Sequence, residues 1–207
     1  MSLSIGAGNY LLGQQTLKSA TRSAAQATSA KRAAPARVAT NANTRFAPSG
    51  SSAGLNTLVA VYPGAERGQA RQGYGQLRDA YPQVARQLGL PLNDVASALA
   101  SFLVGSYMAY HNTPFADAHV KPLADQMRGA LASEGGCGRM SDAEKESIYD
   151  QMVMLGMMMA TTQVQLQQQP DARVEAQLRE VGRQFLEGML QVKADRVRLT
   201  AAGLRIE

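Results

Sequence analysis

The run of residues from Val95 to Tyr110 places the strongest constraint on the fold of this chain, because it contains no charged side chain. Its larger apolar residues, such as Leu99 and Phe102, cover more than one face of a helix. A helix that is apolar on most sides has to be surrounded by protein. A second segment, Met152–Ala160, is apolar on every side within a longer helical pattern. These two segments predict a pair of central helices that lie against each other.

Three other segments carry a single apolar stripe and therefore predict helices that surround the central pair. Their apolar residues recur at the helical spacing over Ala70–Leu88, Val120–Leu131 and Val174–Met189. Strong helix formers dominate the composition, and runs of β-branched residues are nearly absent. We therefore predict an all-α protein, a compact bundle of about five long helices. The tail Arg196–Leu199 alternates charged and apolar residues, as an extended segment does.

Several residues mark where the predicted helices begin and end. Gly89 suits the position just after a helix, and Asn93 is the predicted cap of the charge-free helix. Ser141 and Glu144 have the spacing of a capping box, in which each side chain accepts a hydrogen bond from the other residue's main-chain amide. This box is predicted to open a helix of about 27 residues, which Pro170 ends.

Charge and composition separate the N-terminal part of the chain from the rest. Residues 1–50 hold six bases and no acid, whereas the remaining 157 residues hold 15 bases and 16 acids. A weak helical pattern over Tyr10–Ala30 offers too little apolar area to offset the entropy cost of ordering the backbone. Pro48 and the small residues after it are typical of a linker. We therefore predict a flexible basic arm over residues 1–53 and a helical domain over residues 54–207.

The arm lacks the features of a segment that reads nucleic-acid sequence. Its basic residues are spread out, and Tyr10 and Phe46 are its only aromatic residues. We therefore expect a solvated tether and no specific nucleic-acid partner. A transmembrane segment is not expected, since the longest uncharged apolar stretches of about 16 residues fall short of the roughly 20 that a span requires. No signal peptide is visible.

No motif in the sequence indicates catalysis, a cofactor or a metal site. His111, Asp117 and His119 lie close together, but their spacing matches no known ligand motif. Cys137 is the single cysteine, so an intrachain disulfide cannot form. A thiol exposed beside Arg139 could be reactive, but no base accompanies it, and we interpret it as an incidental loop cysteine. We therefore expect no catalytic residue, no metal and no cofactor, and a protein that is not an enzyme.

Methionine is unusually dense in the second central segment. Met154, Met157 and Met158 could join Tyr107 and Tyr110 of the first segment to line an apolar groove, because methionine side chains repack easily around a ligand. At helical spacing in a central helix, methionine is more often plain core, and we favour that interpretation. The groove stays open as a second hypothesis.

Short motifs spread over the helical domain carry a resemblance: Tyr81–Ala85, Leu88–Pro91, Asn93–Ala96, Ser106–Tyr110, Ser141–Lys145 and Arg196–Leu204. Over about residues 55–204, the chain resembles an uncharacterised family of bacterial, mostly proteobacterial, helical proteins known only as a domain of unknown function. Members typically carry a signal peptide and then a low-complexity segment, so the resemblance implies a periplasmic or secreted protein. The low-complexity segment is present here. Without the signal, a cytoplasmic location is expected. The family has no assigned catalytic residues, and none is implied for this chain.

These observations favour a non-enzymatic domain that binds another protein, of the adaptor or immunity type, in the bacterial envelope. The arm would act as its tether. This expectation rests on the helical bundle, on the lack of a polar constellation and on the resemblance. The alternative is a binding protein that holds a small apolar ligand in the Met/Tyr-lined cleft.

Overall fold

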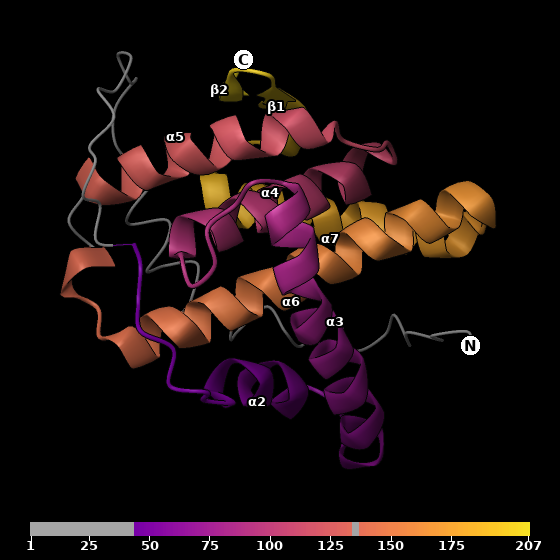
Figure 1. The fold of residues 1–207 in the computed structure, drawn as a ribbon. Coiled ribbons are helices and arrows are strands. Elements are labelled where there is room, and N and C mark those ends of the chain that lie inside the picture. Colours follow the sequence, from indigo (N-terminus) through magenta and orange to yellow (C-terminus); the bar gives the residue numbers. More distant parts are fainter. Residues whose placement is uncertain (1–43, 134–136) are drawn as a thin grey trace.

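The computed structural model describes residues 44–133 and 137–207, which fold mainly into α-helices (Figure 1). The helices and strands are α2 (Ala53–Ala60), α3 (Arg67–Gln87), α4 (Val95–His111), α5 (Val120–Ser133), α6 (Asp142–Gln168), α7 (Ala172–Leu190), β1 (Val197–Thr200) and β2 (Gly203–Ile206). The predicted all-α class is confirmed, with α3 to α7 as the long helices. The helical pattern over Tyr10–Ala30 lies outside the described residues.

Helix α4 forms the centre of the bundle and contacts α5, α6 and α7. Most of its residues are buried, including Leu99 and Phe102. The middle of α6 lies against it (Figure 1). This part of α6 is equally buried, with Val153 and Met154 fully shielded from solvent. The predicted pair of central apolar helices is therefore confirmed.

The central helices touch through glycines. An added Cβ at Gly105 would lie 2.3 Å from the carbonyl oxygen of Gly156, and one at Gly156 would lie 2.7 Å from that of Ser101. Helix α7 approaches α4 almost as closely, since a Cβ at Gly182 would lie 2.6 Å from the carbonyl oxygen of Ser106. No side chain fits at such distances. Helix α4 is therefore held between two neighbours at main-chain contact.

The helices with a single apolar stripe pack around this centre, as predicted. Helix α3 buries Tyr81, α5 buries Leu123 and α7 buries Leu186. On the outer face of α7, Arg183 and Glu187 form an ion pair at 2.7 Å. Each of these helices therefore turns its stripe inward and leaves charged residues toward solvent.

The helix ends follow the sequence with one correction. Gly89 follows α3 with a φ of +66°, the left-handed conformation expected of a glycine just after a helix. The prediction that Asn93 caps α4 was wrong by one residue. Asn93 has a φ of +53°, and an N-cap needs an extended backbone. Asp94 is extended and its side chain accepts a hydrogen bond from the Ser97 N–H, so Asp94 is the cap.

The capping box at the start of α6 is present as predicted. The Ser141 hydroxyl accepts the Glu144 N–H, and the Glu144 carboxylate accepts the Ser141 N–H. We expect Ser141→Ala to lower the free energy of unfolding by about 0.5–2 kcal/mol, because the helix loses one cap acceptor. Urea unfolding followed by circular dichroism measures this. Gln165→Ala, at an exposed position of the same helix, serves as a control and should change stability by less than about 0.5 kcal/mol. Equal midpoints for Ser141→Ala and the control would contradict a stabilising cap.

Strands β1 and β2 form a small antiparallel hairpin. The predicted extended tail Arg196–Leu199 is confirmed from Val197 on, whereas Arg196 ends a short 3-10 turn. The side chain of Gln126 on α5 binds the outer edge of β2 at one residue. Its Oε1 accepts the Leu204 N–H at 2.6 Å, and its Nε2 donates to the Leu204 carbonyl at 3.0 Å. The hairpin is thereby fixed against α5.

Residues 44–52, here called the strap, directly precede α2 in the chain and lie against the helical body (Figure 1). Composition assigned them to the flexible arm, yet Thr44 is fully buried and Phe46 is 8% exposed. The Phe46 N–H donates to the Asn93 carbonyl, and the Val95 N–H donates to the Thr44 carbonyl, which makes a short antiparallel bridge. The strap therefore packs with the domain, and residues 1–43 of the predicted arm lie outside the described residues.

Candidate interaction site

The methionines of the predicted groove lie in the core or at its border. Met154 is fully buried and Met158 is 6% exposed, and the Tyr74 hydroxyl lies 3.9 Å from the Met158 sulfur. Met157 is half-buried and packs against the core from outside. This placement agrees with the interpretation of methionine as core.

The two tyrosines of the predicted groove lie at the C-terminal end of α4. The ring of His111 packs between them, with ring centroids 4.2 Å from Tyr107 and 4.8 Å from Tyr110. Tyr110 also borders an open hollow of about 400 Å³ along α7. The rest of the lining comes from α7: Ala172, Glu175, Ala176, Arg179, Glu180 and Arg183. In this hollow Tyr110 is joined by none of the other residues of the predicted groove.

The two histidines are half-buried and the cysteine is buried. Burial, together with the charges of Arg198 and Arg179, lowers the pKa of His111 and so favours the neutral form of its ring. The Cys137 thiol, which the sequence suggested to be exposed, is buried, and burial raises its pKa. Over the described residues, no group of three His, Cys, Asp or Glu side chains is placed to hold a metal ion.

Asp94 is the centre of a buried polar network at the start of α4. Its carboxylate accepts hydrogen bonds from Thr44 Oγ1 at 2.5 Å, from Ser97 Oγ at 2.6 Å and from Arg128 Nη2 at 2.7 Å. Burial opposes the charge of Asp94, but these hydrogen bonds outweigh it and hold the pKa below its ordinary value. One carboxylate thus joins the strap, α4 and α5.

Phe46 anchors the strap in an aromatic pocket. Its ring meets Tyr149 of α6 edge-on, with centroids 5.3 Å apart, and Tyr149 meets Tyr81 of α3 in the same manner at 5.9 Å. Such edge-to-face pairs are favourable beyond the apolar area that they bury. The Tyr81 hydroxyl lies 3.1 Å from that of Ser101, so its polar end is satisfied. Phe46 therefore lies at one end of a row of three aromatic rings, Phe46, Tyr149 and Tyr81.

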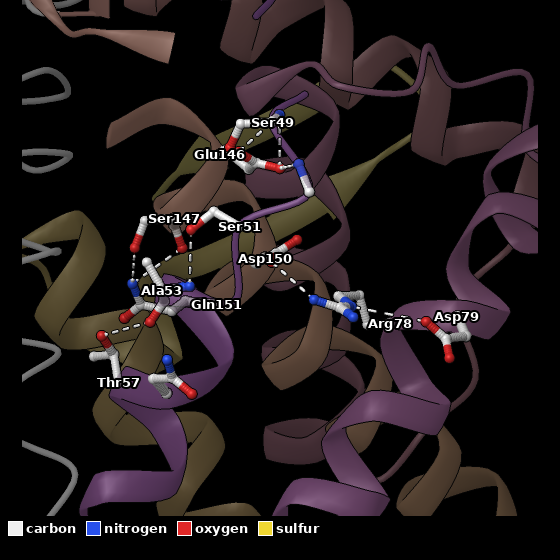
Figure 2. A network of polar contacts seen from close by, with 12 residues as sticks. Ser49, Ser51, Ala53, Thr57, Arg78, Asp79, Glu146, Ser147, Asp150 and Gln151 are labelled. Atoms are coloured by element: carbon white, nitrogen blue, oxygen red, sulfur yellow. Dashed lines mark hydrogen bonds and ion pairs between the residues drawn. The ribbon is translucent and has the colours of Figure 1, made fainter. Parts of the chain in front are cut away.

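The main chain of the strap is held by two carboxylates of α6. Glu146 accepts the N–H groups of Ser49 and Gly50 at 3.0–3.2 Å and the Ser49 hydroxyl at 2.5 Å (Figure 2). Asp142, one turn earlier, accepts the Ala47 N–H at 3.1 Å. Burial disfavours the charge of Glu146, but the hydrogen bonds from Ser49 and its neighbours lower the pKa on balance. These contacts bind the main-chain N–H groups of a segment that turns at Gly50, where φ is +73°.

We call the surface that holds these residues the strap groove. It consists of the Asn93 carbonyl and the side chains of Asp94, Asp142, Glu146 and Tyr149. The groove combines acceptors for main-chain N–H groups with one aromatic pocket, which is the combination that peptide-binding surfaces use.

Asp150 lies one turn beyond Glu146 and is buried between helices. Its nearest charged partner is Arg78 of α3, with 3.6 Å between Nη1 and Oδ2 (Figure 2). Gly54 of α2 covers it so closely that an added Cβ would lie 2.7 Å from the Asp150 Cβ. Burial and the charge of Glu146 raise the pKa of Asp150 to about 6, against the influence of Arg78. The folded protein therefore disfavours the charged form of this carboxyl.

The raised pKa of Asp150 predicts how the stability of the protein depends on pH. The ordinary pKa of 3.8 applies to the unfolded chain, so folding becomes more favourable as the pH falls through 6 toward 3.8 and Asp150 takes up its proton. We expect Asp150→Asn to stabilise the protein at pH 7.5 by up to about 3 kcal/mol, and by roughly half of that at pH 5.

Urea unfolding of both proteins at the two pH values measures the difference. Asp79→Asn, on the exposed side of Arg78, is the control and should change little at either pH. A destabilising Asp150→Asn, or a gain that does not shrink in acid, would show that burial does not disfavour this charge.

Sequence reasoning missed the residues of the strap groove. The predicted cap of α4 was Asn93, one position before Asp94. Asp142, Glu146 and Asp150 recur at a spacing of four residues, which puts them on one face of α6 before its apolar middle. That repeat was the available signal. Acids at the start of a helix are common for dipole reasons alone, and so the spacing did not identify a site.

Comparison with known proteins identifies the family of this chain. A family model described as "Family of unknown function (DUF6683)" matches residues 8–207. No curated protein matches the chain, and no solved structure matches it. Within residues 44–133 and 137–207, no helix combines the length and the apolar character needed to cross a membrane.

Proposed function

Because this chain belongs to a family of unknown function, its role has to be argued from its own geometry, and we propose that it is a non-enzymatic protein-interaction domain. We propose further that it is of the adaptor or immunity type and works in the bacterial envelope. The observation that supports an interaction role is the strap groove. There the helical body binds a non-helical segment through main-chain N–H groups and one aromatic side chain.

The contacts of the groove fit recognition of a chain segment better than chemistry on a small molecule. The carboxylates of Asp142 and Glu146 are both occupied by main-chain donors. Such contacts supply affinity for a main chain, whereas the pocket around Phe46 supplies selection for a side chain. Support for the envelope comes from the low-complexity segment before the domain, which the resembled exported proteins share.

Site-specific photocrosslinking tests this proposal in cells of the organism that carries the gene. The full chain receives a photoreactive residue at Arg45 or at Ala47, which are exposed beside the groove. A matched variant carries it at Arg205, which is exposed on β2 far along the chain. We expect a crosslinked protein at the strap positions and none at Arg205, and we expect the chain in the periplasmic fraction. Absence of any protein product at Arg45 and Ala47 would contradict an interaction role for this site.

The alternative, a carrier of a small apolar ligand, draws less support from the geometry. Met154 and Met158 are buried in the core, and the hollow beside Tyr110 is bordered by charged residues of α7, among them Arg179 and Arg183. Native mass spectrometry of the chain purified from its own organism tests it. A bound small molecule that copurifies with the folded chain would favour the carrier.

A further inference from the structure

The strap is bound to the domain as a separate ligand would be. Its polar contacts with α6 and with the start of α4 join residues that are at least 47 positions apart in the chain. Ala47, Ser49 and Gly50 are exposed, whereas Phe46 is inserted into its pocket. The strap can therefore leave the groove without opening the contacts between α4, α6 and α7.

The groove is chemically incomplete when the strap is removed. Asp94 is fully buried and Glu146 is 6% exposed, so both carboxylates rely on hydrogen bonds to offset their burial. Departure of the strap would take the Thr44 hydroxyl from Asp94 and the Ser49 and Gly50 N–H groups from Glu146. The burial of both carboxylates is that of the protein with the strap in place, so water has to replace these donors once the strap leaves. The vacated groove then presents the same acceptors to a new occupant that carries matching donors.

The contacts define what such an occupant has to offer. A hydroxyl two positions before an aromatic residue reaches Asp94, as Thr44 does ahead of Phe46. Main-chain N–H groups are needed at the aromatic residue and at the positions of Ala47, Ser49 and Gly50. Pro48, which has no N–H, falls at the one position between them where no main-chain donor to the groove is used.

We propose that the strap groove is the partner site of this domain, and that its partner is another protein with a non-helical segment of the strap's chemistry. That segment has a hydroxyl residue, an aromatic residue two positions later and small residues with available N–H groups after it. The inference rests on the proposed function and names its partner class. The strap then holds the groove closed until the partner replaces it.

Tethering gives the strap an advantage over a partner in solution. A short flexible connection provides an effective concentration on the order of millimolar, so a competing segment binds the unaltered chain poorly. Weakening the strap without altering the groove removes this competition. Phe46→Ala takes away the aromatic anchor, and Ser49→Pro takes away an N–H and a hydroxyl at an exposed position.

The test uses a fluorescent synthetic peptide of residues 44–52 and the full chain, with binding followed by anisotropy. We expect the peptide to bind Phe46→Ala and Ser49→Pro about tenfold or more tightly than it binds the unaltered chain. Circular dichroism checks that each variant is folded, and Ser49→Pro, which leaves the core untouched, keeps the test decisive if Phe46→Ala is unstable. Adding Glu146→Gln to either variant should weaken binding. A peptide with alanine in place of Phe46 should bind at least tenfold less well.

Failure of the peptide to bind either folded variant, or equal binding of the peptide without Phe46, would overturn this inference. The proposed function would then still be judged by crosslinking at Arg45 and Ala47, which does not depend on peptide exchange. Light scattering could show that the unaltered chain forms a concentration-dependent dimer and that the peptide dissociates it. The groove would then be assigned to the strap of a second copy. That result would also overturn the partner class proposed here.

Discussion

Replacing Gly105 with alanine is expected to lower the free energy of unfolding by about 2–4 kcal/mol. The new Cβ would lie 2.3 Å from the carbonyl oxygen of Gly156, which belongs to the main chain of α6 and has no rotamer to change. Helices α4 and α6 would have to separate, and the buried contacts on both would loosen. The better helix propensity of alanine, about 1 kcal/mol, offsets only part of this cost.

Gly75→Ala is the matched control, because Gly75 lies inside α3 with no atom within 4 Å of an added Cβ. That change should stabilise the protein by about 0.5–1 kcal/mol. Urea unfolding of the two variants beside the parent chain measures both effects. A gain in stability for Gly105→Ala as well would mean that α4 and α6 do not meet at main-chain contact.

Replacing Asp94 with alanine is expected to cost about 3–5 kcal/mol, the range for breaking a buried charge pair. The change removes the cap of α4 and the acceptor of the Thr44 hydroxyl, and it leaves Arg128 without its buried partner. Asp125→Ala is the control, since this carboxylate also pairs with Arg128 but is largely exposed. Asp125→Ala should lower the free energy of unfolding by less than about 1 kcal/mol.

The pH dependence of the same variant provides a second check. The folded pKa of Asp94 is lowered, so the stability that it supplies is present above its ordinary pKa of 3.8 and is lost as the pH falls through the folded value. The difference between the parent chain and Asp94→Ala should therefore shrink in strong acid. Thermal unfolding from pH 7 downward measures it. A difference that is small at pH 7, or that does not change in acid, would contradict a charged Asp94 in the folded state.

Periodicity was sufficient to predict the helical class and the central pair. The absence of charge over Val95–Tyr110 and Met152–Ala160 identified the buried helices, because a helix surrounded by protein carries few charged side chains. The glycine contact between them left no such trace. Gly105 and Gly156 are each one small residue in an apolar helix, and only their juxtaposition in space reveals the close crossing.

Composition predicted that the packed domain begins at residue 54, whereas it begins at the strap. Residues 47–52 have the composition of a linker, and their partners Asp142 and Glu146 lie about a hundred positions away in the chain. Main-chain hydrogen bonds to distant carboxylates depend little on the side chains of the strap, so no local pattern indicates them. Phe46, an isolated aromatic residue in this segment, was the available signal.

The hydrogen bonds between Gln126 and Leu204 bear on how this protein behaves in a crowded solution. A two-stranded hairpin has open edges, and an open edge is a template on which strands of other molecules add and aggregate. The amide of Gln126 binds the N–H and the carbonyl of Leu204 in the way that a neighbouring strand would. It therefore blocks the outer edge of β2 at this residue. A single side chain of α5 thus occupies one of the main-chain positions on which a strand of another molecule could pair.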